Sequence, residues 1–505
     1  MAETSSSTSN NGSVPILKLA PDHLFTILLL LPIDSILSFS MSCKRFRSLA
    51  CSDSLWESIC RRDWEQKSVD ALKSVYHHHE RQLLPWMSLY EKVYKLDSVY
   101  CHKLSDPDGE FMVPSPRASH SLNFVSDCLV LFGGGCEGEG LNQEDNVGRL
   151  DKSDLKRYSR RDKSEKTIMQ SVSGQKSSLV PKDTGRHLDD TWVAHTGKDF
   201  QRMLKWQKVT SGVPSGRFGH TCVVIDNYLV LFGGINDRGD RLNDTWVGQV
   251  SGHDNFGITL SWRLLDVVSS VPPPRGAHAS SCIDNQKMVI HGGIGMHGVR
   301  LDDTWVLELS ESLQSGTWHQ IVTSPSPPAR SGHTLTCIRE AQLVLFGGRG
   351  LGYDVLNDIW LLEMNEDHPR WIQILYDLWN VPKGASLPRV GHSATLILGD
   401  KVLIYGGEDS CRHRKDDFWV LDVNKIPSIR VQPASLKLKP LFTGMWKGLK
   451  AKGYKPNCRS FHRACVDHSG WNLYVFGGMV DGLLQPAESS GLRFDGELFL
   501  VDLVL

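Results

Sequence analysis

The stretch that decides the fold is Arg217-Phe-Gly-His-Thr-Cys-Val-Val-Ile-Asp-Asn-Tyr-Leu-Val-Leu-Phe-Gly-Gly234, followed by Asp244-Thr-Trp246. It holds two apolar, β-branched runs that are separated by a short Asp-Asn turn. Such runs are typical of strands buried on both faces. We therefore expect two antiparallel strands. The second ends at a glycine pair, whose missing side chains permit positive φ and the close approach of a neighbouring backbone.

The same pattern recurs six times along the chain. The glycine pairs are Gly133-Gly134, Gly233-Gly234, Gly292-Gly293, Gly347-Gly348, Gly406-Gly407 and Gly477-Gly478. The upstream Arg-x-x-His pairs are Arg117/His120, Arg217/His220, Arg275/His278, Arg330/His333, Arg389/His392 and Arg459/His462. An acidic-x-Trp motif ends at Trp192, Trp246, Trp305, Trp360 and Trp419, and the sixth copy reads Glu497-Leu-Phe499. Self-similarity of this kind predicts one all-β unit copied around a closed or stacked array.

Each copy offers four strands. The third strand carries the tryptophan of the acidic-x-Trp motif, and an outer strand begins with a second tryptophan in four copies, at Trp206, Trp262, Trp318 and Trp371. In the fifth copy we find no such tryptophan in register, and Trp446 lies outside the pattern after a long basic segment. Four antiparallel strands repeated six times predict a six-bladed β-propeller.

The last copy supplies only three strands. An unpaired strand edge invites aggregation, so another segment must cover it. Residues 99–104, Val-Tyr-Cys-His-Lys-Leu, lie where an outer strand should begin, with Tyr100 in the place of the tryptophan. We expect this N-terminal strand to complete the sixth blade and seal the ring.

The first hundred residues are of a different kind. Residues 1–14 are rich in Ser, Thr and Asn and are expected to be a disordered tail. Apolar residues at helical spacing then predict a small all-α domain over residues 15–64, with one helix stopped by Pro32 and the next capped by Asp34. Residues 65–97 form a helical linker, in which Pro85–Tyr94 is a helix expected to pack on the end of that domain. The propeller spans residues 98–505.

The repeats resemble the kelch repeat, a resemblance that covers about three quarters of the chain and implies a six-bladed propeller. The helical domain resembles the F-box, through the order Pro21, Leu24, Ile27-Leu28, Leu31-Pro32, Asp34, Cys43-Lys44, Phe46-Arg47, Leu49 and Leu55-Trp56. Members of that family dock on a Skp-type adaptor that hangs from a cullin. By this resemblance the adaptor-binding surface includes Pro21, Leu24, Ile27, Leu28, Leu31 and Pro32.

The charge and the cysteines restrict the class of partner and the compartment. The net charge of −1 gives no electrostatic argument for nucleic acid or membrane. Twelve cysteines occur without any Cys-x-x-Cys, which indicates a reducing compartment, the cytoplasm and/or the nucleus. Residues 151–186 carry ten Lys/Arg against five Asp/Glu and are expected to be a disordered insertion in the first blade.

Signals of catalysis are weak. The glycines of residues 133–138 match Gly-x-Gly-x-x-Gly, but no helix pattern follows them. Cys458, His462 and Cys465 have zinc-like spacing, but His462 belongs to the sixfold register and is expected in the core. Kelch propellers include copper oxidases, whose leader and converging ligands are not evident here. An active site is needed once and a blade contact six times, so we expect no enzyme activity, cofactor or metal.

Two classes of function remain. In the first, the chain is the substrate-recognition subunit of an SCF-type cullin-RING ubiquitin ligase, and the propeller binds the target protein. In the second, it is a kelch interaction scaffold not engaged in ubiquitination. The loops after the glycine pairs are the candidate target contacts, because propeller loops vary while blade cores repeat. The candidate contacts are Arg238, Arg349, Tyr353 and Arg412.

Overall fold

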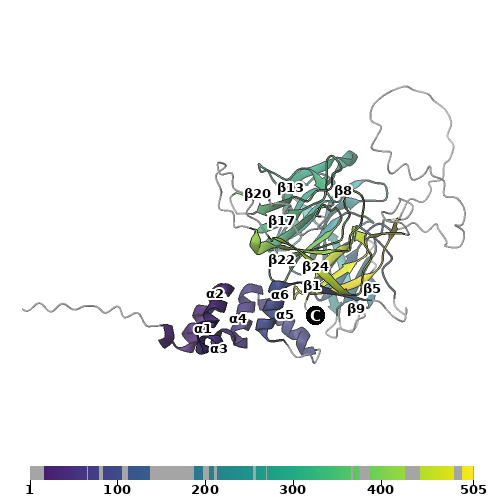
Figure 1. Cartoon of the computed structure of the whole chain (residues 1–505). Coiled ribbons are helices and arrows are strands. Elements are labelled where there is room, and N and C mark those ends of the chain that lie inside the picture. The colour runs from purple at the N-terminus through teal and green to yellow at the C-terminus, as the bar shows by residue number, and fades with distance from the viewer. Residues whose placement is uncertain are drawn as a thin grey trace, which may run out of the picture. The chain divides into compact units, whose positions relative to one another are not determined.

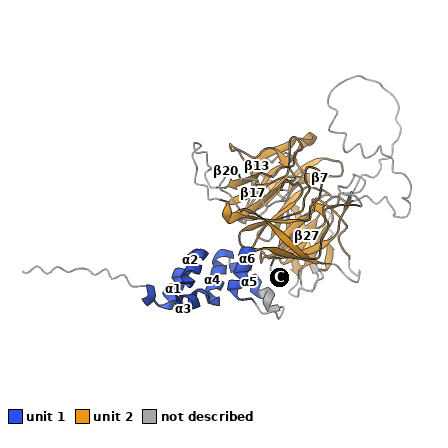
Figure 2. Cartoon of the chain, viewed as in Figure 1, with its two compact units in different colours: residues 1–95 blue, residues 96–505 orange. Residues whose placement is uncertain are grey.

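The structure is a computed structural model, which describes residues 16–64, 66–78, 84–104, 112–136, 187–196, 204–209, 213–253, 257–268, 270–339, 341–364, 368–375, 387–426, 444–482 and 492–503. The chain divides into two compact units, residues 1–95 and 96–505 (Figure 2). The first is helical and the second is built of strands (Figure 1). The expected disordered segments, 1–14 and 151–186, lie outside the described residues. Among the described helices, none has the length and apolar character needed to cross a membrane.

The described part of the helical unit holds one 3-10 turn and six α-helices. They are η1 (Ile16–Lys18), α1 (Pro21–Leu29), α2 (Ile33–Ser40), α3 (Lys44–Ala50), α4 (Asp53–Trp64), α5 (Gln66–His78) and α6 (Trp86–Lys95). One expected cap is wrong, because α2 begins at Ile33 and Asp34 lies inside its first turn, with Pro32 at the N-cap. Helix α5 occupies a segment in which the sequence pattern identified no individual helix.

Helix α6 packs against α4, as the pattern of residues 85–94 predicted. The Tyr90 ring lies 5.3 Å from the rings of both Trp56 and Trp64. Its hydroxyl donates to the Asp63 carboxylate at 2.8 Å. The Trp86 backbone N–H donates to Asp53 at 2.6 Å. The first helical turn of α6 and the first of α4 are therefore tied together by a carboxylate at a helix N-terminus, which is a favourable place for a negative charge.

The described strands of the second unit form the expected six-bladed propeller. Blade one consists of β2 (Ser121–Val125), β3 (Cys128–Phe132), β4 (Thr191–His195) and β5 (Trp206–Val209), and blade two of β6 (Thr221–Ile225), β7 (Tyr228–Ile235), β8 (Arg241–His253) and β9 (Gly257–Leu264). Blade three consists of β11 (Ala279–Ile283), β12 (Lys287–Ile294), β13 (Arg300–Leu309) and β14 (Ser315–Ile321), and blade four of β16 (Thr334–Arg339), β17 (Gln342–Phe346), β19 (Ile359–Glu363) and β20 (Arg370–Ile374). Blade five consists of β21 (Ser393–Ile397), β22 (Lys401–Tyr405), β23 (Phe418–Asp422) and β24 (Trp446–Gly453). Blade six consists of β26 (Arg463–Val466), β27 (Asn472–Phe476), β30 (Leu498–Asp502) and β1 (Ser98–Lys103).

Short elements complete the described part of the propeller. They are β10 (Asp266–Val267), which pairs with β14, η2 (Met296–Gly298), β15 (Arg330–Ser331), β18 (Arg349–Gly350), η4 (Val423–Lys425), β25 (Arg459–Ser460), β28 (Met479–Asp481) and β29 (Leu492–Phe494).

The glycine pairs form the joints between consecutive blades. In the first joint, the Gly134 N–H donates to the Arg217 carbonyl of the next blade at 2.9 Å. A Cβ on Gly133 would lie 2.8 Å from that oxygen, and Gly133 has φ of +66°. Only glycine combines this backbone conformation with so close an approach. The same bond joins the last blade to the first, from the Gly478 N–H to the Arg117 carbonyl at 2.8 Å.

Within each blade, the register arginine is fully buried and paired with the acidic residue of the acidic-x-Trp motif. The pairs are Arg117–Asp190, Arg217–Asp244, Arg275–Asp303, Arg330–Asp358, Arg389–Asp417 and Arg459 with Asp495 and Glu497. In the second blade, the Trp246 indole N–H donates to the same carboxylate at 2.6 Å. Burial has the largest single effect on the pKa of Asp244 and raises it, but the hydrogen bond and charge of Arg217 and the hydrogen bond from Trp246 act together in the opposite direction, so the pKa falls below its usual value.

The ring is sealed by the N-terminal strand, as expected. Strand β1 pairs antiparallel with β30, from Tyr100 opposite Asp502 to Lys103 opposite Phe499. The residue in the register of the outer tryptophans is Cys101, opposite Val501, so the assignment of Tyr100 to that place is wrong by one residue. On its other side β1 pairs in parallel with β24, which joins blades five and six into one eight-stranded sheet.

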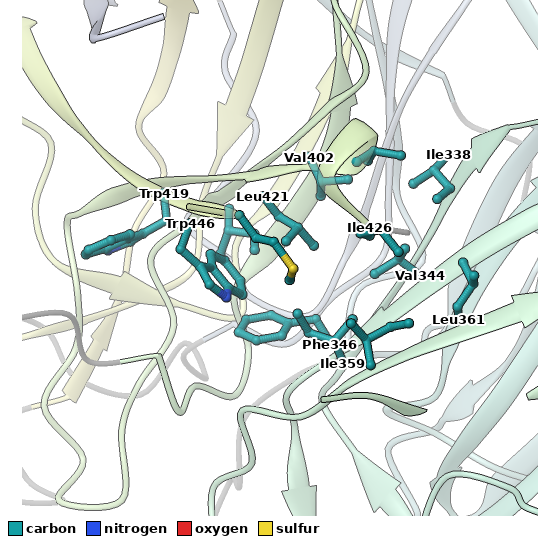
Figure 3. Packing of buried hydrophobic residues seen from close by; sticks show 14 of the residues in the cluster. Ile338, Val344, Phe346, Ile359, Leu361, Val402, Trp419, Leu421, Ile426 and Trp446 are labelled. Atoms are coloured by element: carbon teal, nitrogen blue, oxygen red, sulfur yellow. The ribbon is translucent and has the colours of Figure 1, made fainter. Parts of the chain in front are cut away.

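The fifth blade also has its outer tryptophan, contrary to the expectation from the sequence. Trp446 begins β24 and stands opposite Leu421, two residues after the inner Trp419. The other outer tryptophans stand at the same offset, as Trp371 does opposite Leu362. The long segment before Trp446 obscured this register in the sequence. Figure 3 shows the result, in which Trp446 and Trp419 of blade five share one apolar cluster with Phe346 of blade four.

Candidate functional site

In the helical unit, the apolar residues divide into a core and an exposed set. Leu24 and Leu28 of α1 are each 1% exposed. By contrast, Leu30 is 81% exposed and Met41 is 78% exposed. The exposed large apolar residues of this unit up to α2 and its following turn are Ile16, Leu17, Ile27, Leu30, Leu37 and Met41. Exposed side chains of this kind, gathered in a short segment, are typical of a protein-binding surface.

The turn that carries Leu30 is fixed by α4. The Arg62 guanidinium donates to the carbonyls of Leu29 at 2.7 Å and Leu31 at 3.0 Å. These carbonyls lie at the C-terminal end of α1, where a helix leaves its carbonyls without intrahelical partners. The arginine satisfies them and holds the backbone beside Leu30 in place, which presents that side chain to solvent.

The six residues assigned to adaptor binding differ in their exposure to solvent. Pro21, Ile27 and Pro32 are exposed, and Leu31 is half-buried. Leu24 and Leu28 point into the core of the helical unit, so substituting them would disturb the fold of the unit itself. Leu30 and Met41 were missed, because their positions follow α1 and α2 and fall outside the helical periodicity that selected the others.

In the propeller, the candidate target contacts all follow glycine pairs. Arg238 lies in an exposed turn whose N–H groups bond to Asn236. Tyr353 is 52% exposed, and the Arg300 guanidinium lies 4.5 Å from its ring. Arg412 is exposed and has φ of +64°. Arg349 differs from these three residues, because its guanidinium is already engaged in an ion pair with Glu408 of the next blade at 3.1 Å.

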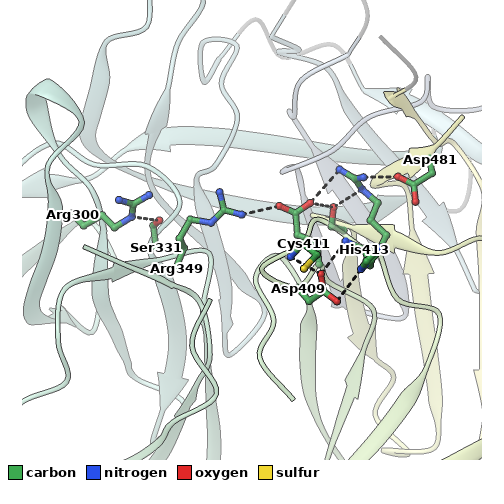
Figure 4. A network of polar contacts seen from close by, with 10 residues as sticks. Arg300, Ser331, Arg349, Asp409, Cys411, His413 and Asp481 are labelled. Carbon is green, nitrogen blue, oxygen red and sulfur yellow. Dashed lines mark hydrogen bonds and ion pairs between the residues drawn. The ribbon is translucent and has the colours of Figure 1, made fainter. Parts of the chain in front are cut away.

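Figure 4 shows the polar network to which Arg349 belongs. Glu408 also accepts from Arg414 at 3.1 Å, and Arg414 pairs with Asp481 at 2.5 Å. The side chains of Glu408, Arg414 and Asp481 are each no more than 9% exposed. The network ties together the loops of blades four, five and six. Glu408, Arg414 and Asp481 were not predicted as contacts from the sequence, because the bonds from Arg349 to Glu408 and from Arg414 to Asp481 join different blades that no local motif connects.

One cluster of possible metal donors lies beside this network. Asp409, Cys411 and His413 bring donor atoms within 4.8 Å of one another, and they form the one such group in the described part of the chain. The Asp409 carboxylate already accepts from the Lys415 ammonium at 2.7 Å and from two backbone N–H groups of its own loop. Because a bound cation would have to displace that ammonium, we assign no metal here.

Comparison with known families accounts for both units. A model of F-box-like domains matches residues 21–62, and the KLHDC2/KLHL20/DRC7 kelch-repeats domain matches residues 173–321 and 255–427. The F-box/kelch-repeat protein At1g51550 of Arabidopsis thaliana is 59% identical over 99% of this chain and 94% of its own length. The chain belongs to the F-box/kelch-repeat family.

Adagio proteins are more distant relatives. Adagio protein 3 of Arabidopsis thaliana is 27% identical over 87% of this chain, and the Adagio-like protein 3 of rice, Oryza sativa subsp. japonica, is also 27% identical over 87%. The chain spans only 58% and 57% of the length of these two proteins. Among solved structures, that of YjhT matches 76% of this chain at 14% identity with a TM-score of 0.45.

Proposed function

We propose that this F-box/kelch-repeat protein is the substrate-recognition subunit of an SCF-type cullin-RING ubiquitin ligase. The observation that carries the proposal is the presence of an F-box-like domain and a complete kelch propeller in one chain. The F-box would dock a Skp-type adaptor, and through it a cullin, while the propeller binds the target protein. Such a subunit raises the local concentration of the target at the ligase and takes no part in covalent chemistry. Its place of work would be the cytoplasm or the nucleus.

The docking residues follow from exposure. Leu30 is the C-cap residue after α1 and keeps right-handed helical backbone angles, so its side chain lies near that of Ile27, three positions earlier in the helix. Both side chains are exposed, and the hydrogen bonds from Arg62 fix the turn between α1 and α2 that carries Leu30. A short apolar face on a fixed backbone suits a helix or groove of a partner protein. We therefore assign adaptor docking to Pro21, Ile27, Pro32 and Leu30, which are exposed. Leu24 and Leu28 are buried and have a structural role.

An adaptor-capture experiment tests the proposal. The Ile27→Asp/Leu30→Asp chain should capture a purified Skp-type adaptor at least about 30-fold more weakly than the intact chain, since loss of an anchor costs about 2 kcal/mol or more. The matched control is Leu264→Asp, which alters a 58% exposed apolar residue on the propeller. Undiminished capture by the double variant would contradict the docking assignment, and no capture by the intact chain would contradict the ligase role.

A second experiment separates the ligase from the scaffold. The intact chain and the Ile27→Asp/Leu30→Asp chain are each used for affinity capture from cells in which the cullin ligases are inhibited. Proteins held by the propeller should be captured by both chains. When the ligase is active, only those that are substrates should become ubiquitinated, and only with the intact chain. Partners that are held equally by both chains and never ubiquitinated would support the scaffold alternative.

A further inference from the structure

The six inner strands of the propeller surround a cavity of about 220 Å³. Strands β2, β6, β11, β16, β21 and β26 each contribute residues to its wall, and each contacts its two neighbours around the ring. Several wall residues, such as Asn123, Ser280 and Ala394, are partly exposed although they lie on innermost strands. Solvent therefore reaches this space, which we call the axial cavity.

One side chain of the wall departs from the sixfold pattern. The residue after each register histidine faces the axial cavity, and in five blades it is small: Ser121, Thr221, Ala279, Thr334 and Ser393. In the sixth blade this residue is Arg463. The propeller thus places a single guanidinium where the other blades place hydroxyl groups or a methyl group.

Arg463 has no acidic partner in the part of the chain that the structure describes. Its Nε donates to the His120 carbonyl at 2.9 Å, and its two Nη atoms form no hydrogen bond with any described residue. No Asp or Glu is among the residues that line the cavity. Burial lowers the pKa of Arg463 to about 10, and no carboxylate raises it again. The guanidinium is therefore a cation at neutral pH, and none of the described residues provides a counter-charge for it.

The histidines around Arg463 do not supply that counter-charge. Burial, together with nearby cations, holds the pKa of His120, His220 and His462 well below the usual value, and Arg463 is one of those cations in each case. These rings are neutral at pH 7. The same relation extends to His278 of blade three and His392 of blade five, so the guanidinium lies within electrostatic reach of five of the six register histidines.

The hydroxyl groups of the wall are oriented by the histidines. Thr221 Oγ1 lies 2.7 Å from His278 Nε2, Thr334 Oγ1 lies 2.9 Å from His392 Nε2, and Ser393 Oγ lies 2.9 Å from His462 Nε2. A guanidinium presents parallel N–H donors that match the oxygens of a carboxylate, phosphate or sulfate, and fixed hydroxyls add further donors. Leaving such a partly buried charge unpaired is costly, whereas an oxyanion would satisfy it.

We propose that the axial cavity binds one small oxyanion, of the size of phosphate or sulfate, on the guanidinium of Arg463. The cavity is several times larger than the space that one water molecule needs, so it can hold the ion with part of its hydration. The bound anion would contact residues from several blades at once and stabilise the closed ring. This inference is independent of the proposed role in ubiquitination.

Calorimetric titration of the full chain with inorganic phosphate tests the proposal, with sulfate, acetate and chloride in parallel at constant ionic strength. The expected result is one phosphate per chain, with sulfate equivalent and chloride inactive. The melting temperature of the propeller should rise with phosphate, because a ligand that binds only the folded state stabilises it. Binding of acetate as tight as that of phosphate would assign the site to carboxylates. No binding of any oxyanion would overturn the proposal.

Three variants place the site at Arg463. Arg463→Met should weaken phosphate binding at least about tenfold, whereas Lys452→Met, which removes an exposed cation on the outer strand β24, should not change it. Ser121→Asp supplies a carboxylate next to His120, whose carbonyl already holds Arg463. It should abolish the response to phosphate even if Arg463→Met does not fold. A phosphate response that persists in Ser121→Asp, or is equal in Arg463→Met and the intact chain, would overturn the assignment.

Discussion

In the propeller, the side chains that recur in every blade are buried, whereas in the helical unit the apolar side chains that leave the helical pattern are exposed. The register arginines are 0% exposed, and Leu30 is 81% exposed. The recurring polar motif of this protein thus builds the fold, although polar and charged residues are the usual candidates for chemistry. The positions that depart from a pattern, such as Leu30 after α1 and Arg463 in the ring of small residues, are the ones available for recognition.

The propeller should fold without the helical unit, provided that it keeps its N-terminal strand β1. A chain beginning at residue 95 keeps β1 and should fold into a monomeric propeller. A chain beginning at residue 115 lacks β1, which lies between β24 and β30, and should aggregate because two strand edges become exposed. Gel filtration and near-UV circular dichroism of the two chains provide the measurement. Equal behaviour of the two chains would show that β1 is not what seals the ring.

The ion pairs of the two units should differ in their contribution to stability. Arg275→Met leaves Asp303, which is 17% exposed, without its partner and should cost about 3–5 kcal/mol of unfolding free energy. Arg61→Met removes a more exposed pair with Glu57 in the helical unit and should cost at most about 1 kcal/mol. Hydrogen exchange resolved along the chain measures both effects, in β11–β14 and in α4 respectively. Similar losses in the two units would refute the structural role of the recurring arginine.

The adjacent glycines of residues 133–135 allow a matched test of the blade joint. Gly133→Ala forces a side chain into positive φ and to 2.8 Å from the Arg217 carbonyl, which should cost about 2–4 kcal/mol. At Gly135 a Cβ would have no neighbour within 4 Å, so Gly135→Ala should change stability by less than about 0.5 kcal/mol. Urea denaturation of both variants gives the difference. Equal costs would show that the joint tolerates a side chain.

The buried histidines predict a smaller effect per residue. Their pKa is lowered by burial, to about 3 for His392, so the unfolded chain binds more protons between pH 3 and 6.5. Propeller stability is therefore complete above pH 6.5 and is lost as the pH falls below it, by up to about 1.4 kcal/mol per pH unit for each histidine. His392→Gln should reduce proton uptake on unfolding by about one at pH 5 and by progressively less toward pH 7, measured from the dependence of the urea midpoint on pH. An unchanged pH slope would contradict a neutral His392.

How much of this could be predicted from the sequence depended on whether a feature repeats. Six copies fixed the glycine joints and the ring closure by β1. The register of Trp446 was missed because the long segment before it hides the spacing from the inner Trp419. Tyr100 was assigned to the place of the outer tryptophan instead of Cys101, and this error of one residue moves the assignment to the other face of the strand. Leu30 and Arg463 could be named only once the backbone was known. Helical periodicity does not reach the turn that exposes Leu30, and the ring around Arg463 joins residues of all six blades.

The pairing of β1 with β30 also sets a condition on how the protein is made. Strand β1 leaves the ribosome about 400 residues before its partner, which at about 5–20 residues per second is roughly 20–80 s of synthesis. The helical unit can form in that interval because its contacts are local. The propeller cannot close in that interval, because β1 can pair with β30 only after β30 has been synthesised. During synthesis, β1 is therefore an exposed strand edge that follows an already folded domain in the sequence, and the growing chain is most vulnerable to misassembly just before β30 is made.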